Sequence, residues 1–91
     1  MLQTVCIVVK GKVQGVFFRH STREAAQQLN IAGKVKNLAD GNVEIIATGT
    51  KEQLKQLISW CRQGPSKAIV TDISIEELPL QEFSHFTIVR F

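Results

Sequence analysis

TVCIVVKGKVQGVFFRHSTREAAQQL, residues 4–29, passes from a strand pattern to a helix pattern through a short connection that contains two glycines. Residues 4–9 are a nearly continuous β-branched run, which is typical of a central strand buried on both faces. From Phe18 onward, apolar or small residues recur at three- and four-residue steps, which predicts one buried face of a helix. A capping box of Ser21 and Glu24 would start the helix later, but the earlier start is favoured because it buries Phe18.

A β-hairpin is predicted after this helix, which should end before Gly33. Val35 opens a short strand, residues 39–42 (ADGN) have turn chemistry, and residues 43–48 alternate as the returning strand.

A second helix and two further strands complete the chain. The helix begins at a capping box of Thr50 and Gln53 and stops at Gly64-Pro65. Residues 69–76 alternate as a strand with one exposed face, in which the isoleucines at odd positions share the buried face with Thr71. Residues 86–91 alternate as a fifth strand.

This order of elements predicts the fold. A strand-helix-strand-strand-helix-strand sequence with one extra terminal strand is typical of the ferredoxin-like, split-βαβ sandwich of the α+β class. We expect one antiparallel sheet with both helices on one face, because right-handed crossovers place them there. Only residues 78–84, around Pro79, lack a pattern. Since 91 residues provide one core, residues 1–91 should form a single domain.

Composition and charge limit the class of partner. The net charge of +3 comes from basic residues that never form a run, which favours a small anion over a polynucleotide. The chain has no run of apolar residues long enough for a membrane span and no leader pattern, so a cytoplasmic protein is expected. Cys6 and Cys61 each stand alone in an apolar pattern, which predicts reduced core thiols.

The connection between the first strand and the first helix is the candidate functional segment. Glycines at 11 and 15 permit positive φ, so successive amides could converge at the positive end of the helix dipole, as suits a phosphate. Arg19 in the first helical turn could hold two phosphate oxygens. Spacing alone leaves open a common strand-turn-helix connection with a solvated arginine. The segment is neither a Walker loop nor a dinucleotide fingerprint.

Two long motifs carry a resemblance to a known family. VxGxVQGVxFR, residues 9–19, is similar to the first signature of the acylphosphatases, and GKVKN, residues 33–37, with the following Gly41, Val43 and Gly49, resembles the second. Trp60, Gly64-Pro65 and residues 86–88 also resemble the family, so the similarity covers nearly the whole chain. Lys34 departs from the usual aromatic residue, and Leu38 stands where a small hydroxylated residue is frequent.

The resemblance implies an activity and a set of site residues. Such a protein hydrolyses the carboxyl-phosphate bond of acyl phosphates, for example acetyl phosphate, carbamoyl phosphate or 1,3-bisphosphoglycerate, to a carboxylate and inorganic phosphate. We expect no metal or cofactor, because the histidines, cysteines and carboxylates show no metal-ligand spacing, and we expect a monomer, because nothing in the sequence predicts an oligomer. Arg19 and Asn37 are the implied catalytic residues, which bind the phosphate and position the water, while Gly11 and Thr22 support the loop. The implied phosphate-binding loop consists of Val13, Gln14, Gly15, Val16, Phe17 and Phe18.

Other functions are weaker candidates. A ferredoxin-like module that binds an anion or a nucleic acid without catalysis is the main alternative, but residues 4–9 carry no aromatic side chain on which a base could stack. A carbamoyl-phosphate-handling domain of a larger maturation protein shares this loop, and the length of 91 residues argues against it. His20 and His85 are interpreted as surface residues without metal-ligand spacing.

Overall fold

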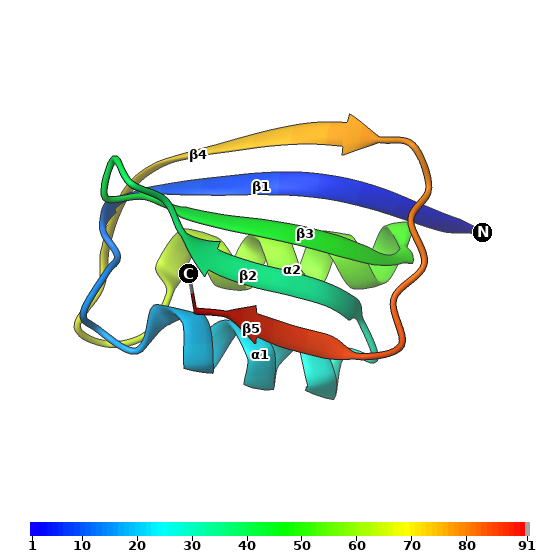
Figure 1. Cartoon of the computed structure of the whole chain (residues 1–91), viewed down its shortest axis with the longest axis horizontal. Helices are drawn as coiled ribbons and strands as arrows, with labels where there is room; N and C mark the ends of the chain where they lie inside the picture. The colour runs from blue at the N-terminus through cyan, green and yellow to red at the C-terminus, as the bar shows by residue number, and fades with distance from the viewer. Residues whose placement is uncertain (91) are drawn as a thin grey trace.

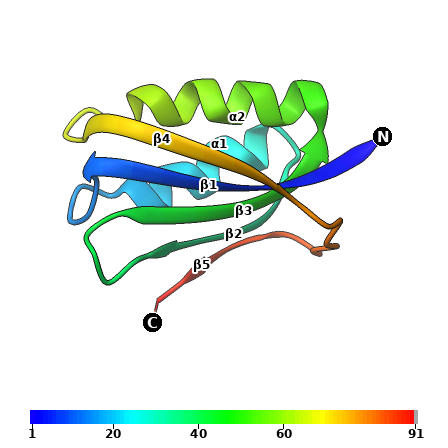
Figure 2. The ribbon, with the colours of Figure 1, turned by 90° about the horizontal axis from the view of Figure 1, so that it is seen from above.

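The computed structural model describes residues 1–90, which form a sheet covered by two helices on one face (Figures 1 and 2). This arrangement confirms the predicted ferredoxin-like α+β sandwich. In chain order the elements are β1 (Leu2–Lys12), α1 (Phe18–Gln28), β2 (Ala32–Asn37), β3 (Val43–Thr50), α2 (Lys51–Gln63), β4 (Ile69–Leu78) and β5 (Phe86–Val89).

The sheet has the strand order β4-β1-β3-β2-β5 and is mixed rather than wholly antiparallel. The first three pairings are antiparallel as expected, but β5 runs parallel to β2. The expectation of an antiparallel sheet is therefore wrong for the last strand. The reason is visible in Figure 1, where β4 ends at the end of the sheet at which β2 begins, so the returning chain enters beside β2 in the same direction. Phe91, expected to end this strand, lies outside the described residues.

Strand β1 is buried on one face only. The side chains that face the helices are fully or nearly fully buried, namely Val5, Ile7 and Val9. Cys6 and Val8, on the opposite face, are half-buried because no helix covers that face. The prediction of a central strand with two buried faces is thus wrong in part, and β3 is the middle strand. Of the two predicted core thiols, Cys61 is in the core and Cys6 is not.

A bulge changes the face that β4 presents to the core. Gly11 pairs with Val70 while Lys10 pairs with Asp72, so Thr71 is an extra residue on β4. Because one inserted residue reverses which side chains point inward, Val70 packs against the core and Ile69 is 60% exposed. The predicted alternation beginning at Ile69 is therefore wrong at its start, while Ile73 packs against the core as expected.

The helix boundaries follow the sequence signals. Helix α1 starts at Phe18, the earlier of the two candidate starts, and Phe18 is 2% exposed. Helix α2 has the reciprocal capping box of Thr50 and Gln53, with the Thr50 amide donating to Gln53 Oε1 at 2.8 Å. The helices run in opposite directions, so α1 begins and α2 ends at the same end of the sheet (Figure 1).

The irregular segment before β5 is held across the other end of the sheet. The Gln81 amide donates to Thr4 Oγ1 at 2.9 Å, and Thr48 Oγ1 donates to the Gln81 carbonyl at 2.8 Å. The segment lacks regular structure as expected, but these bonds fix where β5 enters the sheet. They also give hydrogen-bond partners to the hydroxyls of two buried threonines.

Candidate active site

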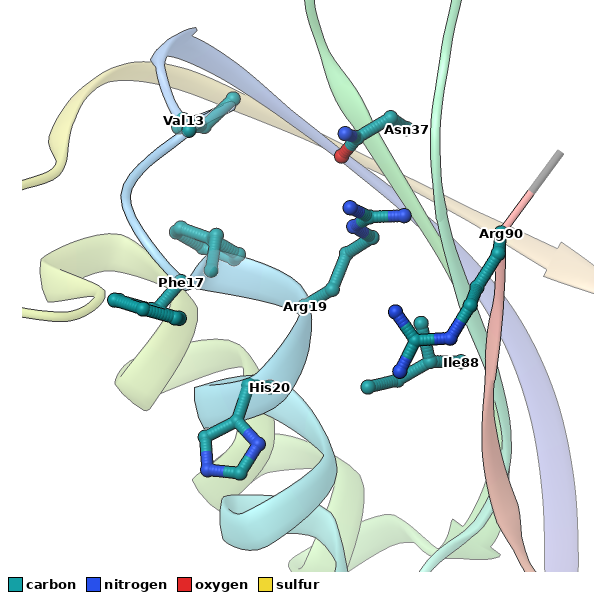
Figure 3. Close-up of a pocket in the computed structure, with 9 residues that line it drawn as sticks. Val13, Phe17, Arg19, His20, Asn37, Ile88 and Arg90 are labelled. Atoms are coloured by element: carbon teal, nitrogen blue, oxygen red, sulfur yellow. The ribbon is translucent and has the colours of Figure 1, made fainter.

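A cavity of about 420 Å³ opens where β1 ends and α1 begins (Figure 3). Its walls come from the β1–α1 loop, the first turn of α1 and the ends of β2 and β5. The lining residues are Val13, Gly15, Phe17, Phe18, Arg19, His20, Asn37, Ile88 and Arg90.

Glycine at position 11 lets the loop leave the sheet at the bulge. Gly11 has φ of +129°, and a Cβ there would stand 2.1 Å from the Ile69 carbonyl oxygen. No side chain fits so close to the backbone of β4. At the far end of the loop Phe17 takes left-handed backbone angles, with φ 62° and ψ 25°, and the residue is 80% exposed. Such angles are uncommon outside glycine and often mark functional loops.

The Gln14 side chain ties the loop to the β2–β3 turn. Its Nε2 donates to the carbonyl oxygens of Leu38 at 2.8 Å and Asn42 at 2.9 Å. These bonds fix the loop against the residue that follows Asn37. The loop and the end of β2, which form two walls of the cavity, are therefore held in a fixed position relative to each other. The family resemblance placed Gln14 in the phosphate-binding loop and did not predict these side-chain hydrogen bonds. The available signal was a long amide side chain within an otherwise apolar connection.

Packing under the loop fixes the first turn of α1. The Phe18 ring lies against Trp60 of α2, with ring centroids 5.5 Å apart and planes tilted by 59°. Thr22 Oγ1 donates to the Phe18 carbonyl at 2.7 Å, a bond between the first and second turns of α1. The support of the loop that the resemblance implies for Thr22 stays a prediction. With Phe18 anchored on one side of the helix, the next residue, Arg19, extends over the cavity.

The start of α1 has no side-chain cap. Its first helical hydrogen bond runs from the Ser21 amide to the Phe17 carbonyl at 3.0 Å, so the amides of residues 17–20 have no acceptor within the helix. They lie at the positive end of the helix dipole, on the cavity. The start of α2, in contrast, is capped by its own chain. An acceptor from outside the protein can therefore satisfy the amides of α1.

Asn37 has an unsatisfied side-chain oxygen at the cavity. It is the last residue of β2, and its Oδ1 is buried without a hydrogen-bond partner among residues 1–90. An unmet buried acceptor costs about 1–3 kcal/mol, so a donor is expected to occupy this position in the working protein. Figure 3 shows the Arg19 guanidinium and the Asn37 carboxamide on the same side of the cavity.

The charge of the cavity is positive. Arg19 is half-buried, Arg90 is exposed, and no aspartate or glutamate is among the lining residues. His20 is exposed, as predicted, and lies at the rim with its Nε2 3.3 Å from Glu24 Oε1. An anion is therefore the ligand that the lining favours.

Three lining residues had no predicted role, and four predicted residues are not in the lining: Gln14 and Val16 of the loop, and the supporting Gly11 and Thr22. His20, Ile88 and Arg90 line the cavity although the sequence marked none of them for it. Val16 is buried in the core, 8% exposed, and Gln14 points to the hairpin. The contribution of β5 could be inferred only with its pairing to β2 in hand, because Ile88 and Arg90 then fall on the face of Asn37.

The departure at Lys34 lies on the other face of the sheet. Val35 faces the helices and is fully buried, so its neighbours Lys34 and Lys36 point away from the cavity. Lys36 Nζ lies 3.8 Å from Glu44 Oε1 on that opposite face. Leu38, the second departure, contacts the loop through its backbone carbonyl.

Together these features define a class of site. Uncapped helix amides, a guanidinium and an unpartnered amide oxygen can hold a small oxyanion and a water molecule side by side. In residues 1–90 no group of three or more His, Cys, Asp or Glu side chains gathers as a metal site. The fold and site therefore define a small ferredoxin-like protein with an oxyanion pocket.

Comparison with known proteins identifies the family. The acylphosphatase family model matches residues 5–88. An acylphosphatase of Marinobacter nauticus is 49% identical over 81 residues, 88% of each chain, and one of Acaryochloris marina is 46% identical over 99% of each. The crystal structure of acylphosphatase from Bacillus subtilis superposes with a TM-score of 0.93 at 40% identity, covering 98% of this chain and 99% of that one. The chain belongs to the acylphosphatase family.

Family membership decides between hydrolysis and non-catalytic binding. The protein is an enzyme for the hydrolysis of acyl phosphates, and a non-catalytic anion- or nucleic-acid-binding module is not favoured. Neither helix within residues 1–90 has the length and apolar character needed to cross a bilayer.

Proposed function

We propose that the cavity holds the phosphoryl group of an acyl phosphate between the loop of residues 13–18 and Arg19, and that Asn37 orients the attacking water. The observation that carries this proposal is that three groups without a partner among residues 1–90 meet on one cavity: the uncapped amides of α1, the Arg19 guanidinium and the Asn37 Oδ1. The loop amides and the guanidinium donate to phosphoryl oxygens.

The reaction requires positioning more than acid or base groups. The water oxygen forms a bond to phosphorus as the bond from phosphorus to the acyl oxygen breaks, and the electron pair leaves on the carboxylate. A proton of the water passes to a phosphoryl oxygen, so the products are a carboxylate and inorganic phosphate. Because the carboxylate is a good leaving group, stabilising charge on the phosphoryl oxygens is the main task of the protein. Arg19 performs that task.

Asn37 suits the water because its oxygen is an acceptor without a partner among residues 1–90. Oδ1 can accept a hydrogen bond from one O–H group of the water, which fixes the water oxygen in line with the bond that breaks. An amide cannot take up the proton, so Asn37 acts by orientation alone.

The proposal extends to the substrates, the oligomeric state and the cellular compartment. Acetyl phosphate, carbamoyl phosphate and compounds of the 1,3-bisphosphoglycerate type are the proposed substrates, hydrolysed without metal or cofactor by a single domain of residues 1–91. We propose a cytoplasmic monomer. The free thiols of Cys6 and Cys61 support a reducing compartment. Acidic residues on the edge strand β4, Asp72, Glu76 and Glu77, oppose pairing of two copies through that edge.

Hydrolysis of benzoyl phosphate, followed with and without a chelator, tests the proposal. Arg19→Ala should lower kcat/KM at least ~10²-fold and weaken competitive inhibition by inorganic phosphate, since a charged donor is removed where charge develops. Arg62→Ala, which removes an equal charge from an exposed position outside the cavity lining, is the matched control. Wild-type turnover and phosphate inhibition in Arg19→Ala would refute the role given to Arg19. Loss of activity with chelator would refute metal independence.

A further inference from the structure

A second guanidinium lies on the cavity without a role in the reaction described above. Arg90 follows the end of β5, and its exposed side chain reaches back along the strand over Ile88 (Figure 3). The Arg19 guanidinium lies nearer to Asn37 in the same view, whereas that of Arg90 lies on the β5 side. The two arginines therefore contribute to different walls of one cavity.

The cavity is larger than the phosphoryl group requires. Its volume is about 420 Å³, whereas a water molecule takes about 30 Å³ in the liquid and a phosphoryl group is only a few times larger. With Arg19, Asn37 and the loop amides occupied by the phosphoryl group and water, the remaining wall consists of Phe17, His20, Ile88 and Arg90. That wall is the surface that the phosphoryl site leaves for the acyl group of the substrate.

The remaining wall is apolar and carries one positive charge that has no carboxylate partner among residues 1–90. The Phe17 ring and the Ile88 side chain supply apolar surface. His20 is paired with Glu24 at 3.3 Å, which offsets its charge when protonated. Arg90 forms no ion pair with any carboxylate of residues 1–90. A cation at the end of an apolar wall is complementary to an acyl group that ends in an anion.

We infer that Arg90 is a specificity residue that makes the enzyme prefer acyl phosphates whose acyl group carries a second negative charge, a carboxylate or a phosphate. This inference rests on the proposed function, because it assigns the wall that the phosphoryl site leaves free. The interaction is a binding contact made equally in the ground state and the transition state, so it lowers KM and has little effect on kcat.

The test compares two aromatic substrates that differ in charge and hardly in shape, 4-carboxybenzoyl phosphate and 4-carbamoylbenzoyl phosphate. Their kcat/KM ratio is measured in the wild type, Arg90→Gln, Arg90→Lys and Arg62→Gln. Arg90→Gln should lower the ratio about tenfold, the effect of one charged hydrogen bond, mainly through KM of the carboxylated substrate. Arg90→Lys should restore most of the ratio, Arg62→Gln should leave it at the wild-type value, and added salt should reduce it. Thermal unfolding of each variant reports on folding.

Two results would overturn the assignment. An equal loss for both substrates in Arg90→Gln would make Arg90 a ligand of the phosphoryl group, and an unchanged ratio would show that it contacts no part of the substrate. Failure of the proposed function would give a different kinetic result. In that case Arg19→Ala would leave hydrolysis of both substrates intact, whatever Arg90→Gln does to their ratio.

Discussion

Asn37 lies at the end of β2 with its side-chain oxygen facing the cavity and no partner among residues 1–90. If this oxygen orients the water, Asn37→Ala should lower kcat at least ~10²-fold, a barrier increase of about 2.7 kcal/mol, while inhibition by phosphate stays nearly intact. Folding stability should not decrease, because the substitution removes an unmet buried acceptor. Steady-state kinetics and urea unfolding measure the two effects.

A matched control separates the site from the hairpin. Asn42→Ala removes a side chain that bonds Asp40 in the turn and leaves the carbonyl that accepts from Gln14. Its kcat should equal that of the wild type. Loss of phosphate binding in Asn37→Ala as severe as in Arg19→Ala would identify Asn37 as a support of the loop instead of the residue that orients water.

Cys61 gives a prediction on pH. Burial raises the pKa of its thiol from 9.0 to about 12. The folded state therefore keeps the proton that the unfolded state releases, and stability is fully present below pH 9. Between that pH and about 12 it should fall by up to ~1.4 kcal/mol per pH unit. The difference in free energy of unfolding between the wild type and Cys61→Ala, measured across this range, isolates the effect. Two parallel curves would contradict it.

Cys6 should react with thiol reagents more readily than Cys61, because Cys6 is half-buried and Cys61 is buried. Its pKa is also raised, by partial burial and then by the nearby Glu44 and Glu76 carboxylates, but it lies on the face without helices. That position explains why the sequence pattern misplaced it, since an apolar run does not reveal which face of a sheet a second layer will cover.

At the scale of the element, the capping box of α2 is a stabilising device far from the cavity. Thr50→Ala removes Thr50 Oγ1, which accepts from the Gln53 amide at 3.2 Å. The free energy of unfolding should fall by about 1 kcal/mol. The kcat/KM should not change, because α2 begins at the end of the sheet away from the cavity. Ser59→Ala, at an exposed position within α2, is the control and should stay within about 0.5 kcal/mol of the wild type. Equal losses in both variants would show that the box contributes nothing.

The elements that local sequence could predict are those with local causes. The start of α1 at Phe18, the box at Thr50 and the stop at Gly64 depend on residues within one or two turns. The bulge at Thr71 depends on how closely Gly11 of β1 approaches Ile69 of the neighbouring strand β4. The periodicity within β4 carries no information about that distance.

At the scale of the whole molecule, the same reasoning explains which part of the site the sequence missed. The residues between β1 and α1, with Asn37, were assigned from motifs that keep their spacing along the chain. Ile88 and Arg90 reach the cavity through the parallel pairing of β5 with β2, in which Val35 lies opposite Ile88. That pairing joins residues more than fifty positions apart, so only the assembled sheet reveals it.

If phosphate binds at the uncapped start of α1, as proposed, the product of the reaction takes part in the folding equilibrium. A phosphate ion that satisfies the amides of residues 17–20 binds the native chain and not the unfolded one, so it acts as the missing cap. At a phosphate concentration of 100 times its Kd, the free energy of unfolding should rise by about 2.7 kcal/mol. Unfolding midpoints across a phosphate series at constant ionic strength measure this, and Arg19→Ala should flatten the dependence; a wild-type midpoint that ignores phosphate would contradict it. For a domain whose total stability is of the order of 5–15 kcal/mol, that gain would lower the already small population of unfolded chains about a hundredfold.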